Sequence, residues 1–110
     1  MQYKLYETNE AVEDVTKLAV YMIDKFKNRK AAGDFMNAYD KQVDDLKYFP
    51  FGYRGISLEY RGYEIRLKPF GTYNIFFIID IENKSIVVLR ILKDLQNWKT
   101  ILENQREYHW

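Results

Sequence analysis

Three basic residues in the second half of the chain are the main candidates for chemistry. Arg66 and Lys68 lie two positions apart in an alternating segment, and Arg90 lies in a segment rich in β-branched residues. Side chains two positions apart in a strand share a face, so Arg66 and Lys68 are expected side by side. If Arg90 joined them, the patch would suit an RNA backbone with stacked bases or an acidic, amphipathic peptide. The simpler alternative is that the three cations only solvate the outer face of a sheet.

A second candidate group closes the chain, where residues 106–110 read Arg-Glu-Tyr-His-Trp. Tyr108 or His109 could transfer a proton in RNA cleavage, and a nearby arginine could stabilise the charge that develops on the phosphorane. The alternative is a packed or frayed C-terminus with a peripheral histidine. Both interpretations stay open at the level of the sequence.

The composition excludes several classes of site. The 110 residues include no cysteine and one histidine, which excludes a disulfide framework, a thiolate zinc site and a Ser-His-Asp arrangement away from His109. We therefore expect neither a metal nor a cofactor. A net charge of +1 gives no general case for nucleic-acid binding. The length fits one domain over residues 1–110, and residues 1–7 lack the apolar core of a signal peptide, which predicts a cytoplasmic protein without a membrane segment.

The first half of the chain has the periodicity of helices. Residues 3–7 alternate like a short strand, and two apolar stripes at helical spacing follow, over residues 11–26 and 32–49. The short connection between the stripes predicts an antiparallel helical hairpin, which Pro50 ends. Five aromatic residues of this region are expected in the core or at its edge: Tyr21, Phe26, Phe35, Tyr39 and Phe49.

The second half has the periodicity of strands. Residues 50–62 contain three glycines and are predicted to be a loop with a short extended piece at 56–59. An antiparallel meander of three strands follows, at residues 63–68, 73–79 and 85–92. Asp94 can cap a last helix. The predicted fold class is α+β in the order β-α-α-β-β-β-α, with an N-terminal strand and an antiparallel helical hairpin packed on an antiparallel β-sheet.

Alternation also predicts which way the strand residues face. If Leu67 faces the helices, then Arg66 and Lys68 face away from them. On the last strand, alternation places Arg90 on the same side as Val88. The hypothesis that follows is a small cationic patch on the outer face of the sheet.

Several short segments, taken in order, resemble a known family. They are Tyr3-Lys-Leu-Tyr-Glu-Thr8 before a helix, Leu46-Lys-Tyr-Phe-Pro50 at the end of the hairpin, then residues 65–77, residues 86–92 and the stretch to Trp98. Together they resemble the RelE/ParE superfamily of toxins from bacterial type II toxin–antitoxin systems. The long hairpin and the Phe49-Pro50 loop are closer to the ParE branch than to the RelE branch.

The resemblance implies a growth-inhibiting toxin of the kind that serves in plasmid stabilisation, neutralised by a cognate antitoxin. The C-terminal segment of the antitoxin would lie in a groove between the hairpin and the sheet. The residues expected to bind it are Phe76, Ile78, Val88 and Trp98. ParE-type toxins are associated with inhibition of DNA gyrase, and RelE-type toxins with cleavage of mRNA in the ribosomal A site.

Residue by residue, the chain departs from the RelE-type pattern, and gyrase inhibition is the leading hypothesis. Arg66 matches a basic position of the RelE-type site, whereas Glu64 and Asn74 stand where its cations are expected. Leu95 and Gln96 stand where ParE- and RelE-like proteins both often carry a basic pair after the last strand. RNA cleavage needs cations at the phosphoryl oxygens. The alternative is a ribosome-dependent mRNA endonuclease, an mRNA interferase, with the catalytic residues Arg66, Lys68, Arg90, Tyr108 and His109. A divergent, non-toxic member of the superfamily is the third hypothesis.

Overall fold

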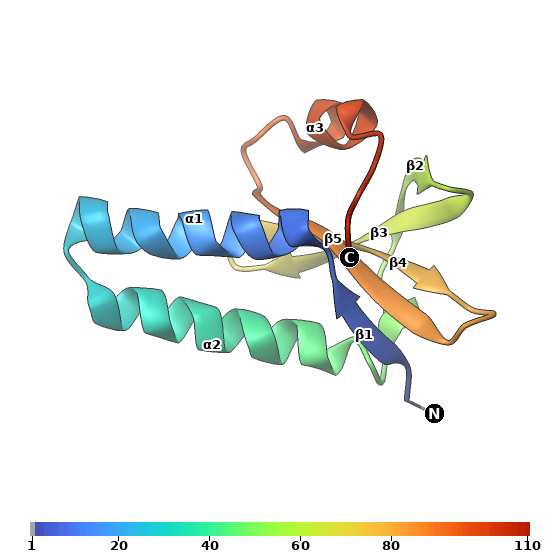
Figure 1. Cartoon of the computed structure of the whole chain (residues 1–110), viewed down its shortest axis with the longest axis horizontal. Helices are drawn as coiled ribbons and strands as arrows, with labels where there is room; N and C mark the ends of the chain where they lie inside the picture. Colours follow the sequence, from blue (N-terminus) through green and yellow to red (C-terminus); the bar gives the residue numbers. More distant parts are fainter. Residues whose placement is uncertain (1) are drawn as a thin grey trace.

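A strand, a helical hairpin, a four-stranded meander and a short C-terminal helix make up the fold. The computed structural model describes residues 2–110. Its elements in chain order are β1 (Lys4–Glu7), α1 (Asn9–Phe26), α2 (Arg29–Asp45), the 3-10 turn η1 (Pro50–Gly52), β2 (Gly55–Tyr60), β3 (Tyr63–Phe70), β4 (Tyr73–Asp80), β5 (Ser85–Lys93) and α3 (Trp98–Asn104). Figure 1 shows α1 and α2 side by side, extending away from the sheet, with α3 on another side. The predicted α+β class is confirmed.

Capping residues explain where the two long helices begin and end. The Thr8 hydroxyl accepts a hydrogen bond from the N–H of Ala11 at the start of α1. Lys27 ends α1 in the left-handed conformation, and Asn28 then accepts from the N–H of Ala31 to start α2. So short a connection makes the two helices antiparallel, as predicted. No helix in the described part of the chain has the length and apolarity needed to cross a membrane.

The sheet is mixed, whereas the sequence predicted an antiparallel one. Its strand order is β1-β5-β4-β3-β2, with β1 parallel to β5 and the other neighbours antiparallel. The meander therefore has the predicted pairing. The parallel pair is possible because the hairpin and the meander together provide the long connection that parallel strands require. Nothing in the alternation of β1 indicates which partner it takes.

Strand β2 occupies much of the segment that was predicted to be a loop. A bulge between Gly55 and Glu59 breaks its alternation, and Ser57 is left-handed with φ 63°. The tight turn to β3 also uses two positive φ values, at Arg61 and Gly62. These irregularities remove the strand signature from the sequence, although the extended piece predicted at 56–59 lies within β2. Pairing with β3 stabilises the strand.

The sheet carries a hydrophobic core on each face. Helices α1 and α2 pack on one, called here the hairpin face, and α3 with the C-terminal tail packs on the other, called the α3 face. Buried residues of the hairpin face include Phe35, Tyr39, Val43, Ile75, Phe77 and Val88. Those of the α3 face include Ile65, Leu67, Phe76, Ile78, Leu102 and Tyr108. Burial on both faces explains why β4 and β5 are almost continuously apolar.

A β-bulge in β5 decides where Arg90 points. Phe77 pairs with Val88 but Phe76 pairs with Arg90, so Leu89 and Arg90 together oppose one residue of β4. The extra residue reverses the alternation along the rest of the strand. Arg90 consequently lies on the α3 face with Phe76, and the prediction that it shares a side with Val88 is wrong.

Strand β3 also faces the opposite way from the conditional expectation. Leu67 pairs with Phe76 on the α3 face, so Arg66 and Lys68 lie on the hairpin face. Because Arg90 lies on the other side of the sheet, the three cations do not converge. The hypothesis of one shared cationic patch is therefore wrong, and the cause is the register of β3 and the bulge in β5.

Candidate functional site

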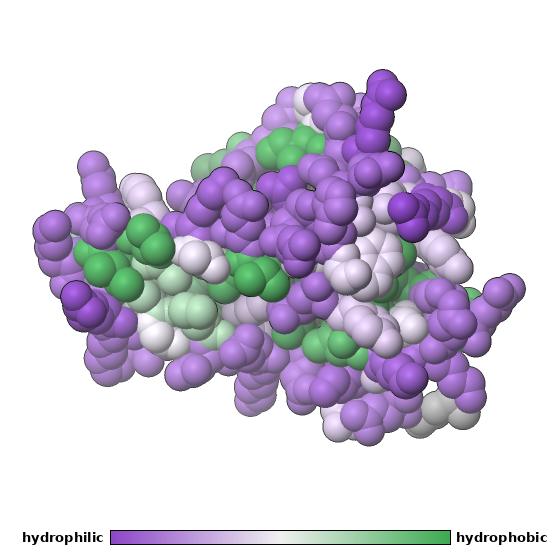
Figure 2. Space-filling model, in the orientation of Figure 1, coloured by the Kyte–Doolittle hydropathy of each residue, from purple (hydrophilic) through white to green (hydrophobic). Residues whose placement is uncertain are grey.

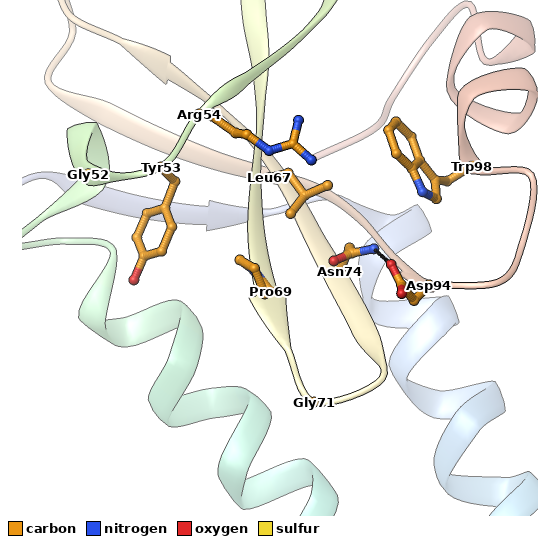
Figure 3. A pocket seen from close by; sticks show the side chains of 9 residues that line it. All are labelled: Gly52, Tyr53, Arg54, Leu67, Pro69, Gly71, Asn74, Asp94 and Trp98. Atoms are coloured by element: carbon orange, nitrogen blue, oxygen red, sulfur yellow. Dashed lines mark hydrogen bonds between the residues drawn. The ribbon is translucent and has the colours of Figure 1, made fainter.

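A cleft opens between the η1 turn, the hairpin of β3 and β4, and the start of α3 (Figure 3). Its volume is 490 Å³. The residues that line it are Gly52, Tyr53, Arg54, Leu67, Pro69, Gly71, Asn74, Asp94 and Trp98. Strands β3 and β4 supply the apolar floor, while loops supply most of the polar rim. Only the folded chain brings these separate segments together.

The polar groups of the cleft include both signs of charge. Asn74 donates from Nδ2 to Oδ1 of Asp94 at 2.9 Å, which holds the carboxylate beside β4. Arg54 is exposed, and its guanidinium extends toward Trp98 across the cleft (Figure 3). Trp98 is half-buried, and its ring centre lies 5.3 Å from that of Phe76. One cation, one anion and an aromatic wall suit a mixed polar and apolar surface better than a polyanion.

Arg66 holds the loop that leads into the cleft, and Lys68 is bound to helix α2. Arg66 donates from Nη1 to the carbonyl oxygen of Tyr53 at 2.8 Å, and its guanidinium carbon lies 5.4 Å from the centre of the Phe51 ring. Lys68 is 4% exposed and donates from Nζ to the carbonyl oxygen of Gln42 at 2.7 Å. Burial lowers the pKa of the Lys68 ammonium. Both cations are occupied by the backbone of their own chain.

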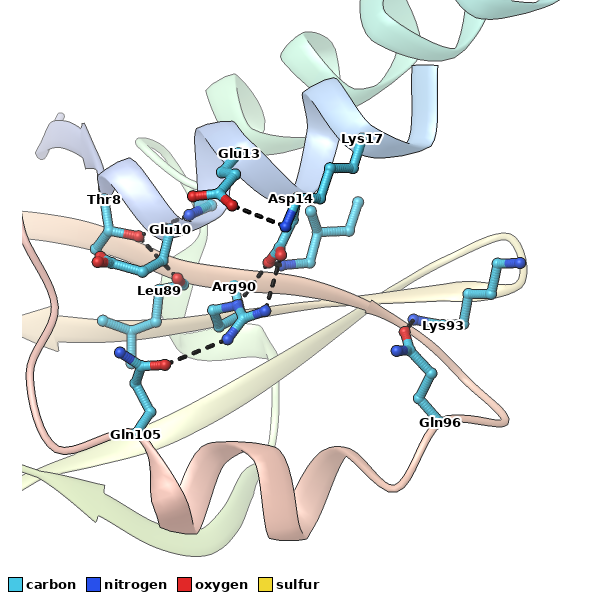
Figure 4. Close-up of polar contacts among 12 residues, drawn as sticks. Thr8, Glu10, Glu13, Asp14, Lys17, Leu89, Arg90, Lys93, Gln96 and Gln105 are labelled. Carbon is cyan, nitrogen blue, oxygen red and sulfur yellow. Dashed lines mark hydrogen bonds and ion pairs between the residues drawn. The ribbon is translucent and has the colours of Figure 1, made fainter. Parts of the chain in front are cut away.

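Arg90 joins helix α1 to the sheet. Its Nε and Nη2 donate to the two carboxylate oxygens of Asp14 at 2.6 and 2.8 Å (Figure 4). The same carboxylate accepts from the N–H of Ile91 at 3.1 Å, and Arg90 Nη1 donates to Gln105 at 3.4 Å. The two charged side chains are only 18% and 13% exposed. A bidentate pair this buried is a structural link, because both charges are already satisfied.

The two C-terminal candidates lie away from the cleft. Tyr108 packs edge-to-face on Tyr60, with ring centres 4.9 Å apart. Burial raises the pKa of Tyr108 to about 12, so its phenol stays protonated at neutral pH. His109 Nδ1 lies 2.7 Å from Glu10 Oε2, and this hydrogen bond raises the pKa of the imidazole. Neither residue lines the cleft, so the five predicted catalytic residues do not form one site.

The four residues predicted to bind an antitoxin lie in different environments. Phe76 and Ile78 belong to the core of the α3 face, with exposed fractions of 0% and 3%. Val88 belongs to the core of the hairpin face and is also fully buried. Side chains that the chain itself covers present no surface to a partner. Of the four, Trp98 alone is accessible, at the wall of the cleft.

The groove predicted between hairpin and sheet is filled by the chain's own side chains. Phe35 and Tyr39 of α2 pack into the hairpin-face core, and the Tyr39 hydroxyl donates to Glu7 at 2.7 Å. Exposed apolar surface lies instead on the outward side of α1. A shallow hollow of 490 Å³ there is lined by Thr16, Lys17, Val20, Tyr21, Asp24 and Lys25. Figure 2 shows apolar side chains at the surface over the hairpin.

The helical pattern did not separate core aromatics from exposed ones. Phe35 and Tyr39 are buried, as predicted. Tyr21, Phe26 and Phe49 are exposed by 46%, 64% and 78%, so their assignment to the core or its edge is wrong. Phe26 is the last residue of α1, and Phe49 lies in the loop between α2 and η1. Periodicity alone does not show which members of a stripe stay covered near the ends of a helix.

Two charged residues of the cleft are not among those that the sequence singles out for a site. Arg54 follows the η1 turn, and Asp94 directly follows β5. Loop residues next to strands are common functional positions, and that location is the signal that could have found them. Asp94 was expected to cap the last helix, but Asn97 takes that role by accepting from the N–H of Thr100.

Residues 6–98 match the family described as "ParE toxin of type II toxin-antitoxin system, parDE". A comparison with curated proteins finds no match. Among solved structures, the chromosomal ParDE TA system from P. aeruginosa contains a chain that is 19% identical with a TM-score of 0.68, covering 84% of this chain and 96% of that one. Chains of two RelBE complexes are also similar. A chain of the RelBE2 complex from Mycobacterium tuberculosis is 22% identical with a TM-score of 0.58, covering 84% of this chain and 99% of that one. A chain of the RelE–RelB complex from Pyrococcus horikoshii OT3 is 18% identical with a TM-score of 0.58, covering 87% of this chain and 99% of that one.

At these identities the structural likeness establishes the fold. The family match is a separate observation, and it extends from β1 through the meander to the first residue of α3. It includes every residue of the cleft. This chain therefore belongs to the ParE toxin family of type II toxin–antitoxin systems.

Proposed function

We propose that this toxin binds DNA gyrase through protein–protein contact, and that an antitoxin neutralises it. The choice of target rests on one observation: the cleft contains one unpaired cation and one carboxylate, and the other candidate cations are bound within the chain. Arg54 makes no ion pair within residues 2–110. Asp94 shares the cleft with it. This balance supports a contact with a protein surface.

RNA cleavage would require groups that this cleft does not assemble. A developing phosphorane needs several cations aimed at its oxygens and a group that can take or give a proton. Arg66 and Lys68 are directed to backbone carbonyls, and Arg90 is paired with Asp14. The Asp94 carboxylate would repel a phosphate. The contacts therefore favour the gyrase-directed reading over the ribosomal one.

The outward side of α1 is the surface that we assign to the antitoxin. Val12, Val20 and Tyr21 are exposed there by 48%, 48% and 46%. The three similar structures named above come from toxin–antitoxin systems, which supports an antitoxin partner for this chain. Apolar surface on a helix fits an amphipathic segment, whose burial would remove these side chains from water.

Controlled expression in bacteria tests the target. Gyrase inhibition predicts filamentous cells, a DNA-damage response and altered plasmid supercoiling, while protein synthesis continues at first. Ribosomal cleavage predicts immediate loss of translation and mRNA cuts in phase with codons. Cells that grow without arrest would contradict both toxin readings and support the non-toxic alternative.

A purified assay makes the same distinction without cellular side effects. The chain is added to gyrase that supercoils a relaxed plasmid, and in parallel to a translating extract. We expect dose-dependent loss of supercoiling with intact messages. Full supercoiling at every dose, together with cut messages, would replace gyrase by the ribosome as the target.

A further inference from the structure

The loop after α2 displays three aromatic side chains to solvent. Tyr48, Phe49 and Phe51 are exposed by 50%, 78% and 50%; they are called here the aromatic turn. Single exposed apolar residues are ordinary on protein surfaces. Three within four positions of one loop form a concentrated apolar surface, and aromatic residues are enriched where proteins bind one another.

The backbone that carries the aromatic turn is held on both sides. The carbonyl of Lys47 accepts from the N–H of Tyr3 at 3.0 Å, and the carbonyl of Arg54 accepts from the N–H of Leu67 at 3.0 Å. Pro50, between the exposed rings, is buried. The rings are therefore presented by a fixed loop, so binding would lose little conformational entropy there.

The Phe51 ring is also fixed by its neighbours. Its centre lies 6.1 Å from that of Tyr3, in an edge-to-face contact, and 5.4 Å from the guanidinium carbon of Arg66. Arg66 thus acts on the aromatic turn rather than on a substrate. Phe49 has no comparable contact among the aromatic and cation–π pairs of residues 2–110, and it is the most exposed of the three rings.

Basic residues outnumber acidic ones around the aromatic turn. Lys47 precedes it and pairs with Asp44 at 2.7 Å, and the exposed Asp45 is the second acidic residue there. Arg54 follows it without an ion pair in the described chain, and Lys4 shares a hollow with Tyr3 and Lys47. The complementary partner surface is an apolar pocket bordered by carboxylates.

We propose that the aromatic turn is the target-binding surface of this toxin, with Phe49 inserted into an apolar pocket that aspartate or glutamate side chains border. The inference rests on the proposed function and names the part of the chain that performs it. A protein fits better than single-stranded nucleic acid. Stacked bases need open ring faces along a basic track, whereas Arg66 lies over the Phe51 ring.

The test compares two exposed phenylalanines. Phe49→Ala changes the aromatic turn, and Phe26→Ala is the matched control, 64% exposed at the far end of the hairpin. The 17 residues of α2 separate the two positions by about 25 Å. Far-ultraviolet circular dichroism and the melting temperature verify that both variants fold. Binding to intact gyrase, and to a fluorescent single-stranded RNA, is measured for the wild type and each variant.

We expect Phe49→Ala to weaken gyrase binding by about tenfold or more, and Phe26→Ala to leave it within about twofold. If the wild type binds gyrase and Phe49→Ala binds it with the same affinity, the inference is overturned and gyrase remains the target. A larger loss of gyrase affinity in Phe26→Ala than in Phe49→Ala would place the binding surface at the hairpin tip. No wild-type binding to gyrase would reject the proposed function itself. An RNA affinity that depends on Phe49 would show a nucleic-acid surface instead.

Discussion

The cations on both faces of the sheet are bound by groups of the protein itself, whereas the cation of the cleft is exposed to solvent. On the hairpin face, Arg66 and Lys68 are bound to backbone carbonyls. On the α3 face, Arg90 is bound to Asp14. Arg54 at the cleft is exposed and unpaired within the described chain. Among these four cations, the three in strands serve structure, and the one in a loop is available to a partner.

Breaking the Arg90–Asp14 pair should give the largest of the expected effects, a loss of unfolding free energy. In Arg90→Ala the Asp14 carboxylate keeps the N–H of Ile91 but loses its cation in a mostly buried position. Removing one partner of such a pair costs about 3 kcal/mol or more of unfolding free energy. Urea denaturation measures the loss.

The control for that variant is Lys17→Ala, which breaks an exposed pair with Glu13. Its unfolding free energy should match the wild type, because exposed pairs on one helix contribute little. Equal stability of Arg90→Ala and Lys17→Ala would show that Arg90 is not a structural cation, and the comparison between strand and loop cations would fail.

Arg54→Ala should separate binding from stability. The side chain is exposed, so the melting temperature should not change. Gyrase affinity should fall about threefold at low salt, as for a charge at the rim of an interface. The difference from wild type should shrink in high salt because counterions screen the interaction. A lower melting temperature with unchanged affinity would place Arg54 among the structural cations.

The smallest effect should come from His109, an exposed residue paired with Glu10. The pKa of His109 is raised in the fold, so the folded state holds the proton more tightly than the unfolded state. Its stabilising contribution is complete below the ordinary pKa of about 6.5 and is lost as pH rises through the raised value. Melting temperatures of the wild type and His109→Gln should therefore converge between weakly acidic and weakly alkaline pH. A constant difference across that range would mean that the ion pair contributes nothing.

Helical and strand periodicities predicted most of the elements. The stripes of α1 and α2 and the short connection at Lys27 and Asn28 are local features, and local features were enough for the hairpin. The meander was equally predictable because each strand follows the last through a short turn. Strand β2 was harder, since the bulge after Gly55 and the left-handed Ser57 erase its alternation.

The candidate site was much less predictable than the fold. The order of apolar and polar residues says that Arg66 and Lys68 share a face, but it does not say which core that face covers. The bulge at Leu89 and Arg90 is set by how β4 and β5 pair, and it turns Arg90 away from the other two. Arg54 and Asp94 meet at one cleft only because the meander and the η1 turn fold against each other.

The order of residues thus decided the element types, the hairpin and the family resemblance, because helix caps, turn residues and apolar spacing act over a few positions. Strand register, the bulge and the parallel pairing of β1 were decided by the packed molecule, because they depend on contacts between segments far apart along the chain. Those contacts determine which cations are bound by other groups of the protein and which are exposed to solvent. The exposed aromatic turn was also decided by the packed molecule, since the helical stripe that includes Phe49 does not show that this ring stays uncovered.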